Sequence, residues 1–318
     1  MSADLSTRHR FISILLSLAV IGVGAQGATG ASLPSEERIR KHGGKGDDVL
    51  IGKGGNDRLS GGAGDDIIIG DDASSNGRAS GSGNDKLNGG AGNDIVVGDA
   101  YSPVGASGSG NDDISGGPGN DELVGDALVG NYRRNGSGDA RGSGNDEING
   151  LPGTDLVVGD AAVHGFGVAE CSGNDKLNGE GNRRGGRNVS GLGKAIELIV
   201  GDCYSSKGSA LGAGSDRPII NGGDGRDVLV GDNYAPGQAK GRGDERNMLG
   251  GNGNDLVYGD HHPVSGDRSG GGRDQPRGGD GNDKLFGGPS RDKCSGGSGN
   301  DKFAQRGRES CEKTTGAP

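Results

Sequence analysis

The chain of 318 residues contains few large apolar side chains. It has no tryptophan, four phenylalanines and five tyrosines, and only 29% of its residues are hydrophobic. An ordinary two-layer globule of this length buries more large apolar surface than this composition supplies. Disulfides, a bound metal or strict repetition are the usual other sources of stability. The formal charge of -10 argues against nucleic acid as a partner, because phosphate recognition needs a basic face, whereas cation binding fits the sign.

The common catalytic motifs are also missing. The sequence has no H-E-x-x-H, no G-x-S-x-G elbow and no C-x-x-C. Its histidines include His42 and His164, which are isolated, and the adjacent pair His261 and His262, which we interpret as surface loop residues rather than transition-metal ligands. We therefore expect no catalytic residues and no enzymatic activity.

Only one long apolar run is present, FISILLSLAVIGVG at residues 11–24, preceded by Arg8 and Arg10. Its length and its basic start are typical of a secretory signal peptide, with cleavage between residues 25 and 31. An uncleaved membrane anchor is the alternative. We expect a signal peptide over residues 1–27, a linker over 28–42, a secreted mature chain without a membrane span, and cysteines that form disulfides.

Glycine and aspartate are what the chain has in abundance, and they recur with a period of nine residues. Residues 43–69 read GGKGDDVLI, GKGGNDRLS and GGAGDDIII without a gap, and the pattern continues to residue 304. An apolar residue stands at position eight, for example Leu50, Leu59, Ile68 and Val96. Each nonapeptide therefore predicts half of a solenoid coil. It consists of six turn-forming residues and a three-residue strand with one inward side chain.

Stacked coils bring the aspartates at position six into a ladder. Neighbouring strands lie about 4.7–4.9 Å apart, so adjacent carboxylates repel by roughly 3 kcal/mol at an effective dielectric of 20. A hard divalent cation resolves this conflict, and Ca²⁺ suits it better than Mg²⁺ because it accepts six to eight oxygens in flexible geometry.

The pattern GGxGxDxUx, with U a large apolar residue, resembles the hemolysin-type calcium-binding repeat of RTX proteins. The resemblance implies an all-β fold, a parallel β-roll forming a two-sheet right-handed solenoid over residues 43–304, that is disordered without Ca²⁺ and folds when it binds several Ca²⁺ ions. The carboxylates that would be metal ligands by position are Asp48, Asp57, Asp66, Asp85, Asp94, Asp112, Asp121, Asp146, Asp155, Asp175, Asp227, Asp255, Asp283, Asp292 and Asp301.

Two features depart from the plain repeat. Between residues 70 and 277 the nonapeptides come in pairs, and each pair is followed by Gly-Asp and an insert, with Gly-Asp at 70/71, 98/99, 125/126, 159/160, 201/202, 231/232 and 259/260. We expect the inserts to leave at one corner as a fringe of polar loops. The stretch 179–200 has no aspartate at the ligand position, which predicts a missing or weak Ca²⁺ site in that coil.

The strands of the two expected sheets differ in composition. Those of the first sheet, such as KLN and EIN, have polar residues beside the inward one, whereas those of the second, such as IVV and LVV, are apolar on both faces. An apolar outer face is unfavourable on a soluble monomer. We expect the inserts to fold over it, and a dimer or partner interface is the alternative.

The four cysteines are placed to form two bridges. Cys294 takes the inward position eight of its nonapeptide, so a bridge to Cys311 would strap the C-terminal segment 305–318 over the open end of the solenoid. Cys171 and Cys203 end one insert and begin the next, and they would staple adjacent coils. Free or differently paired thiols remain the alternative.

These observations predict a secreted Ca²⁺-binding repeat protein that folds on binding the ion and has a structural or surface-interaction role outside the cell. A Ca²⁺-dependent carbohydrate-binding adhesin is the second possibility, although stacking aromatics are limited to Tyr101, Tyr132, Tyr204, Tyr234 and Tyr258. Ice binding is disfavoured, because the chain has too few threonines for a flat array. The identity of a surface glycan or protein partner is open.

Overall fold

The structure is a computed structural model. It describes residues 38–131, 134–179, 188–189, 193–194, 197–212, 214, 219–241, 243–263, 268–269, 271–303 and 311–313. The expected signal peptide, 1–27, lies outside the described residues, as do most of the linker and most of the C-terminal segment. In the part of the chain that is described, no helix is long and apolar enough to cross a membrane.

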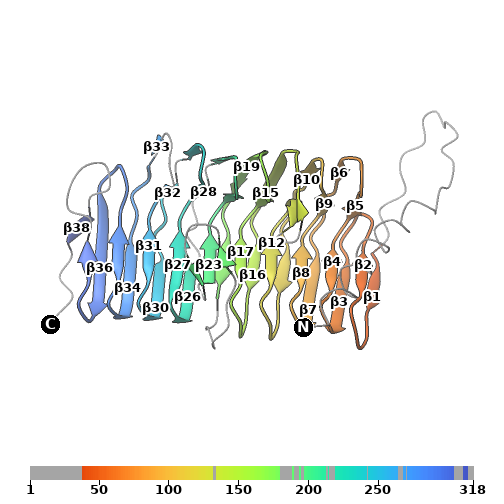
Figure 1. The fold of residues 1–318 in the computed structure, drawn as a ribbon, viewed down its shortest axis with the longest axis horizontal. Helices are drawn as coiled ribbons and strands as arrows, with labels where there is room; N and C mark the ends of the chain where they lie inside the picture. Colours follow the sequence, from red (N-terminus) through yellow and green to blue (C-terminus); the bar gives the residue numbers. More distant parts are fainter. Residues whose placement is uncertain are drawn as a thin grey trace, which may run out of the picture.

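Short parallel strands stack into coils along one axis, and each insert-bearing coil passes through four sheets (Figure 1). Sheet 1 has eleven strands, β1 (Arg40–His42), β3 (Arg58–Ala63), β7 (Lys86–Ala91), β11 (Asp113–Ser115), β16 (Glu147–Asn149), β20 (Lys176–Asn178), β26 (Ile219–Gly225), β30 (Met248–Gly253), β34 (Pro276–Gly281), β36 (Asp292–Ser298) and β38 (Cys311–Lys313). Sheet 2 has ten, β2 (Val49–Ile51), β4 (Ile67–Ile69), β8 (Ile95–Val97), β12 (Glu122–Val124), β17 (Leu156–Val158), β23 (Glu197–Val200), β27 (Asp227–Val230), β31 (Leu256–Tyr258), β35 (Lys284–Phe286) and β37 (Lys302–Phe303).

Sheets 1 and 2 form the predicted β-roll, which we call the lower lobe. Its core consists of the position-eight side chains, including Leu59, Ile68, Leu87 and Val96. The register keeps these residues in line from coil to coil, with Leu87 beside Leu59 and Val96 beside Ile68. The outer face of sheet 1 is polar, since Lys86 and Asn88 on either side of Leu87 are exposed. The all-β parallel solenoid expected from the sequence is confirmed.

The inserts are not loops, contrary to the prediction. They form two more stacks of strands, which we call the upper lobe. Sheet 3 contains β5 (Asp72–Ala73), β9 (Ala100–Ser102), β13 (Ala127–Asn131), β18 (Ala161–Val163), β24 (Cys203–Ser205), β28 (Tyr234–Ala235) and β32 (His262–Pro263), with β14 (Arg134–Asn135) beside β13. Sheet 4 contains β6 (Ala79–Ser80), β10 (Ala106–Ser107), β15 (Ala140–Gly144), β19 (Val168–Gly173), β25 (Ser209–Gly212), β29 (Ala239–Lys240) and β33 (Arg268–Ser269). A separate pair, β21 (Asn188–Val189) and β22 (Gly193–Lys194), is antiparallel.

Small side chains let the two sheets of the upper lobe pack closely. Ala100, Ala127 and Ala161 of sheet 3 meet Ala106, Ala140 and other alanines of sheet 4 in one buried cluster. Alanine has no strong preference for strands. Repetition in register across neighbouring coils therefore fixes these short segments as strands.

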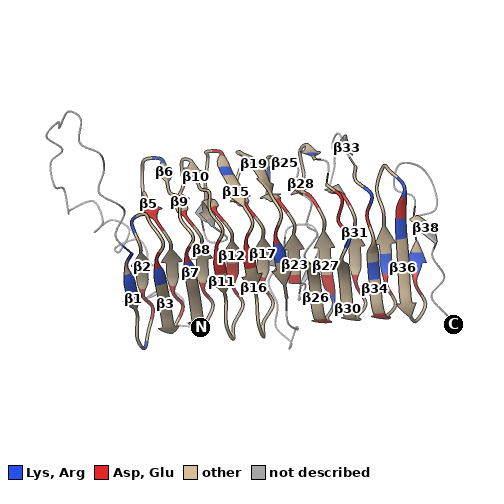
Figure 2. Cartoon of the chain, turned by 180° about the vertical axis from the view of Figure 1, so that it is seen from behind, with Lys and Arg blue, Asp and Glu red and all other residues tan. Residues whose placement is uncertain are grey.

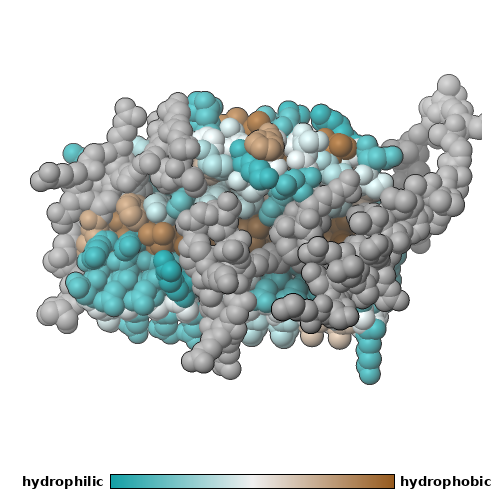
Figure 3. Space-filling model, in the orientation of Figure 1, coloured by the Kyte–Doolittle hydropathy of each residue, from teal (hydrophilic) through white to brown (hydrophobic). Residues whose placement is uncertain are grey.

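The apolar outer face of sheet 2 is covered by the upper lobe, which confirms the expectation that the inserts fold over it. Val97, Val158 and Val200 belong to the same buried cluster as Leu128 and Tyr204 of sheet 3. On the visible face, apolar residues gather in a band between the two lobes (Figure 3). The partly buried members of this cluster are Val49, Ile51, Ala73, Leu256 and Tyr258.

Two disulfides hold the stack, with the expected pairing. Cys171 of sheet 4 is bonded to Cys203 of sheet 3, with 5.8 Å between the Cα atoms, and so joins adjacent coils of the upper lobe. Cys294, fully buried in the core of the lower lobe, is bonded to Cys311 with a Cα separation of 5.4 Å. This bond holds β38 against β36 at the end of sheet 1.

Candidate metal centres

The turns from sheet 1 to sheet 2 form the outer edge of the lower lobe, and the turn Gly89–Asp94 shows how they are built. Gly90 and Gly92 have φ angles of 112° and 144°, which favour glycine. Gly89 is needed for another reason: a Cβ there would lie 2.4 Å from Asp94 Oδ2 and 2.5 Å from the Gly116 carbonyl oxygen. A carboxylate oxygen and a carbonyl oxygen of the next coil therefore face the same point.

Carboxylates follow this edge from coil to coil. The backbone N–H of Asp66 donates to Asp94 Oδ1 at 2.8 Å, and the N–H of Asp94 donates to Asp121 Oδ1 at the same distance. The second oxygen of Asp94 is buried and has no hydrogen-bond partner. The sequence-predicted residues on this edge are Asp48, Asp66, Asp94, Asp121, Asp155, Asp227, Asp255, Asp283 and Asp301.

The outer edge has no gap in the coil where an aspartate was missing. Glu197 lies in register with Asp227 of the next coil, and its neighbour Leu198 pairs with Leu156, which follows Asp155. Glu197 is fully buried, and burial, with the charges of Asp155 and Asp227, raises its pKa well above the usual range. A glutamate thus takes the place of the missing aspartate, and the missing or weak Ca²⁺ site in this coil stays a prediction. Glu197 stands two residues before the inward Ile199, the same offset at which the repeat has its aspartate, and this sequence feature was overlooked.

The remaining predicted carboxylates lie where the chain enters sheet 1. They are Asp57, Asp85, Asp112, Asp146, Asp175 and Asp292. In the insert-bearing coils this entry point lies between the two lobes, a region that we call the waist. The N–H of Asp85 donates to Asp112 Oδ1 and the N–H of Asp112 donates to Asp146 Oδ1, both at 2.7 Å. The waist thus contains a second ladder of the same kind as the outer edge.

A third row of carboxylates at the waist was not recognised in the sequence. It consists of the aspartates of the Gly-Asp pairs, Asp71, Asp99, Asp126, Asp160, Asp202, Asp232 and Asp260, all of them buried. These residues connect sheet 2 to sheet 3, and they face the ladder that enters sheet 1. The sequence shows that Gly-Asp recurs after each apolar strand, but we interpreted it only as the point where an insert begins. Figure 2 shows acidic residues recurring along the stack.

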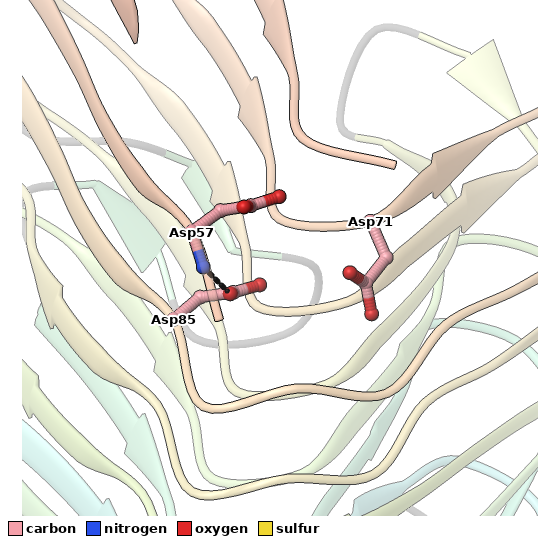
Figure 4. Close-up of side chains that lie close together, drawn as sticks. All are labelled: Asp57, Asp71 and Asp85. Carbon is pink, nitrogen blue, oxygen red and sulfur yellow. Dashed lines mark hydrogen bonds between the residues drawn. The ribbon is translucent and has the colours of Figure 1, made fainter. Parts of the chain in front are cut away.

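The two waist rows combine into clusters of three carboxylates. In Figure 4, Asp71 points from one side of the waist toward Asp57 and Asp85 on the other. In each cluster one oxygen per residue lies within 4.8 Å of the other two. The clusters are Asp57, Asp71 and Asp85; Asp85, Asp99 and Asp112; Asp112, Asp126 and Asp146; Asp146, Asp160 and Asp175; and Asp232, Glu245 and Asp260.

No positive side chain is buried with these acids. The described residues include 24 buried aspartates and glutamates and no buried lysine or arginine. Burial, together with the charge of Asp146, raises the pKa of Asp112 to about 9. Burial also raises the pKa of Asp85 to about 7, and burial with the charge of Asp112 raises that of Asp99 to about 10. Without a bound cation, Asp112 and Asp99 favour the protonated form at neutral pH, and Asp85 favours it below about pH 7.

The adjacent histidines are placed differently from the sequence-based expectation. His261 and His262 are buried, not surface loop residues; His164 is also buried, whereas His42 is exposed. His164 Nε2 lies 2.6 Å from Glu122 Oε1, and His261 Nδ1 lies 3.5 Å from Asp232 Oδ2. Burial lowers the pKa of His261 to about 4, so it is neutral at pH 7 and does not offset the waist charge.

Comparison with known proteins gives one match. The family model described as the RTX calcium-binding nonapeptide repeat (4 copies) matches residues 42–74, 79–100, 106–127, 142–162, 247–261 and 268–303. No curated protein and no solved structure matches the chain. The matched segments contain lower-lobe strands such as β3, β4, β7 and β8 with the carboxylates that precede them, whereas β20, β23, β26 and β27 lie outside these segments.

Proposed function

The chain is an RTX calcium-binding repeat protein, and on this basis we propose that it binds a series of Ca²⁺ ions and folds as it binds them. The observation that carries the proposal is the burial of periodic carboxylates with no lysine or arginine buried beside them among the described residues. The predicted aspartates of the outer edge and of the waist supply carboxylate ligands, and the turn glycines supply carbonyl oxygens. An all-oxygen donor set in a flexible turn suits Ca²⁺ better than Mg²⁺.

Repulsion couples the ion to the fold. Three ionised carboxylates within 4.8 Å of one another repel by roughly 3 kcal/mol per pair at an effective dielectric of 20, or about 10 kcal/mol per cluster. A whole domain is stable by only about 5–15 kcal/mol. The ionised apo chain therefore cannot maintain this structure through several clusters, and binding free energy becomes folding free energy.

The test is circular dichroism at pH 8 against free Ca²⁺, with the disulfides kept oxidised. The β signal is expected to be weak in chelator and to rise cooperatively, with a midpoint of about 0.1–1 mM if the sites resemble other extracellular Ca²⁺ modules. Mg²⁺ at the same concentrations is the control and should give little change. A chain with its full β signal in chelator at pH 8 would refute the proposal.

We further infer that the protein is secreted and has a structural or surface-interaction role rather than a catalytic one. Two disulfides suit an oxidising compartment. Export would remove the N-terminal apolar segment, and N-terminal sequencing of the exported protein should find a start just after a cleavage site within residues 25–31. An intact N-terminus on the exported protein would contradict this.

The carbohydrate-binding alternative gains no support from the aromatic side chains. Tyr101, Tyr204 and Tyr234 are buried, with at most 4% of each exposed, and Tyr204 stacks on Tyr234 with 5.4 Å between ring centroids. Tyr258 is partly buried and stacks on Phe286, and Tyr132 lies outside the described residues. Rings that pack against each other in the apolar cluster do not offer an open platform for a sugar.

A further inference from the structure

Each insert interrupts a nonapeptide between its first and second residues, yet the turn keeps its geometry. In the coil of residues 98–112 the first glycine is Gly98 and the ligand-position aspartate is Asp112. A Cβ on Gly98 would lie 2.1 Å from Asp112 Oδ2 and 1.6 Å from the Gly125 carbonyl oxygen. The uninterrupted turn beginning at Gly89 brings the same two kinds of oxygen together. The carboxylate and carbonyl oxygens of the repeat are therefore brought together in the same way whether or not an insert interrupts the turn.

The insert adds one more carboxylate to this arrangement. Asp99, which follows Gly98, has an oxygen within 4.8 Å of an oxygen of Asp85 and of Asp112. All three side chains are at least 98% buried. Asp85 Oδ2, Asp112 Oδ2 and both oxygens of Asp99 have no hydrogen-bond partner. Buried acceptors that converge without a donor are costly unless a cation binds them.

The charge at the waist matches one divalent ion per coil. Each such coil contributes one Gly-Asp carboxylate and one nonapeptide carboxylate, a charge of -2. Neighbouring clusters share Asp85, Asp112 and Asp146, so each of these carboxylates can bridge two positions along the row. No lysine or arginine among the described residues is buried and able to supply the positive charge.

The waist is also too narrow for a protein side chain to enter. A Cβ added to Gly108, in the segment that leads from β10 back to β11 of sheet 1, would lie 2.7 Å from Asp99 Oδ2 and 2.9 Å from the Asp126 Cβ. A cation at the waist must therefore come from solution and be small.

We propose that the waist binds a row of divalent cations, one at each of these carboxylate clusters, and that this row fastens the upper lobe to the lower lobe. Four of the clusters have two nonapeptide carboxylates and one Gly-Asp carboxylate, and the fifth has Glu245 with the Gly-Asp carboxylates Asp232 and Asp260. The proposal rests on the Ca²⁺ binding inferred above and adds a class of site that the nonapeptide alone does not contain. Ca²⁺ is the ion expected, because every ligand is an oxygen.

The test counts Ca²⁺ ions bound to the full oxidised chain by native mass spectrometry, at the lowest free Ca²⁺ that saturates the wild type. The waist variant carries Asp71→Asn, Asp99→Asn and Asp126→Asn. A control variant carries Asp72→Asn and Asp113→Asn, two neighbours of waist residues, of which Asp72 is exposed and Asp113 is half exposed. Asp94→Asn removes a carboxylate from the outer edge only. The waist variant should bind three fewer ions, and the control should bind as many as the wild type.

Hydrogen exchange in the same samples tests the fastening role. In the waist variant, amides of β9, β10 and β13 should exchange at least ten times faster than in the wild type, while those of β7 and β8 stay protected. If the waist variant does not fold in saturating Ca²⁺, Asp99→Asn alone replaces it, with a loss of one ion expected.

The outcomes separate the two proposals. A waist variant, or Asp99→Asn, that binds as many ions as the wild type overturns the waist row. If Asp94→Asn then still loses an ion, Ca²⁺ binding by the repeat stands without the waist row. A wild-type chain that binds no Ca²⁺ overturns both.

Discussion

Acid should fold the protein in the absence of calcium. The perturbation is a change from pH 8 to pH 5 in chelator. Burial raises the pKa of Asp112 to about 9 and that of Asp85 to about 7 in the folded chain, against 3.8 as the ordinary value. Between the ordinary and the raised pKa, the folded state binds more protons than the unfolded state, so its stability rises as the pH falls.

The magnitude is large relative to domain stability. A pKa of about 9 keeps Asp112 protonated in the fold from pH 8 to pH 5, which makes the apo fold about 4 kcal/mol more stable at pH 5. Asp85 adds about 3 kcal/mol, mostly gained below pH 7. The contribution is complete below the ordinary pKa and is lost as the pH rises through about 7 to 9. Two or three such groups equal the stability of a typical domain.

The assay is far-UV circular dichroism with urea unfolding, in chelator, at several pH values. The apo chain should gain β signal and urea resistance between pH 8 and pH 5. The stabilisation produced by added Ca²⁺ should shrink over the same range, because protons and Ca²⁺ compete for the same carboxylates. Asp112→Asn should make the apo chain more stable at pH 8 and the Ca²⁺-bound chain less stable, whereas Asp113→Asn, half exposed beside it, should change neither. An apo chain that is less structured at pH 5 than at pH 8 would refute the reasoning.

Three further predictions follow from single features. Lys53 has a φ of 97° at a turn position that is usually glycine, so Lys53→Gly should stabilise the Ca²⁺-bound fold by about 1 kcal/mol in urea unfolding. An unchanged or lower urea midpoint would contradict this. Replacing Cys171 and Cys203 together by serine should cost about 2–4 kcal/mol in the same assay, whereas a loss below 0.5 kcal/mol would show that the bridge does not constrain the stack. Deleting residues 71–80 joins Gly70 to Gly81 and creates the uninterrupted sequence GGSGND. The variant should fold in Ca²⁺ and bind one ion fewer. A variant that remains unstructured in Ca²⁺ would disprove the continuity of the turn.

The lower lobe was predictable because its information is local and periodic. Leu87 and Val96 are inward because each stands at position eight, and Asp85 and Asp94 reach their ladders because each stands at position six. Stacking brings together residues 27 to 34 positions apart in sequence, and their common position within the nonapeptide supplies that alignment without any knowledge of the insert between them.

The upper lobe was not predictable in the same way. Its strands are two to six residues long, many contain alanine and serine, and the inserts differ in length, so no fixed period aligns them. Strand formation there depends on the neighbouring insert, as when Ala106 pairs with Ala79 on one side and Ala140 on the other. The adjacent histidines were misassigned for the same reason: His261 and His262 are buried because the inserts form a packed lobe.

The site at the waist depends on both kinds of information. Asp112 was recognised from its position in the repeat, but Asp99 acquires its role only because the chain returns to the waist after leaving for the upper lobe. A glycine that opens a nonapeptide can be followed by an insert of variable length, provided that the next glycine comes back beside it. The residue just after the first glycine is then fixed in space whatever the insert contains. Under the proposal above, an aspartate at that position adds one ligand at the point of interruption, whatever the length of the insert.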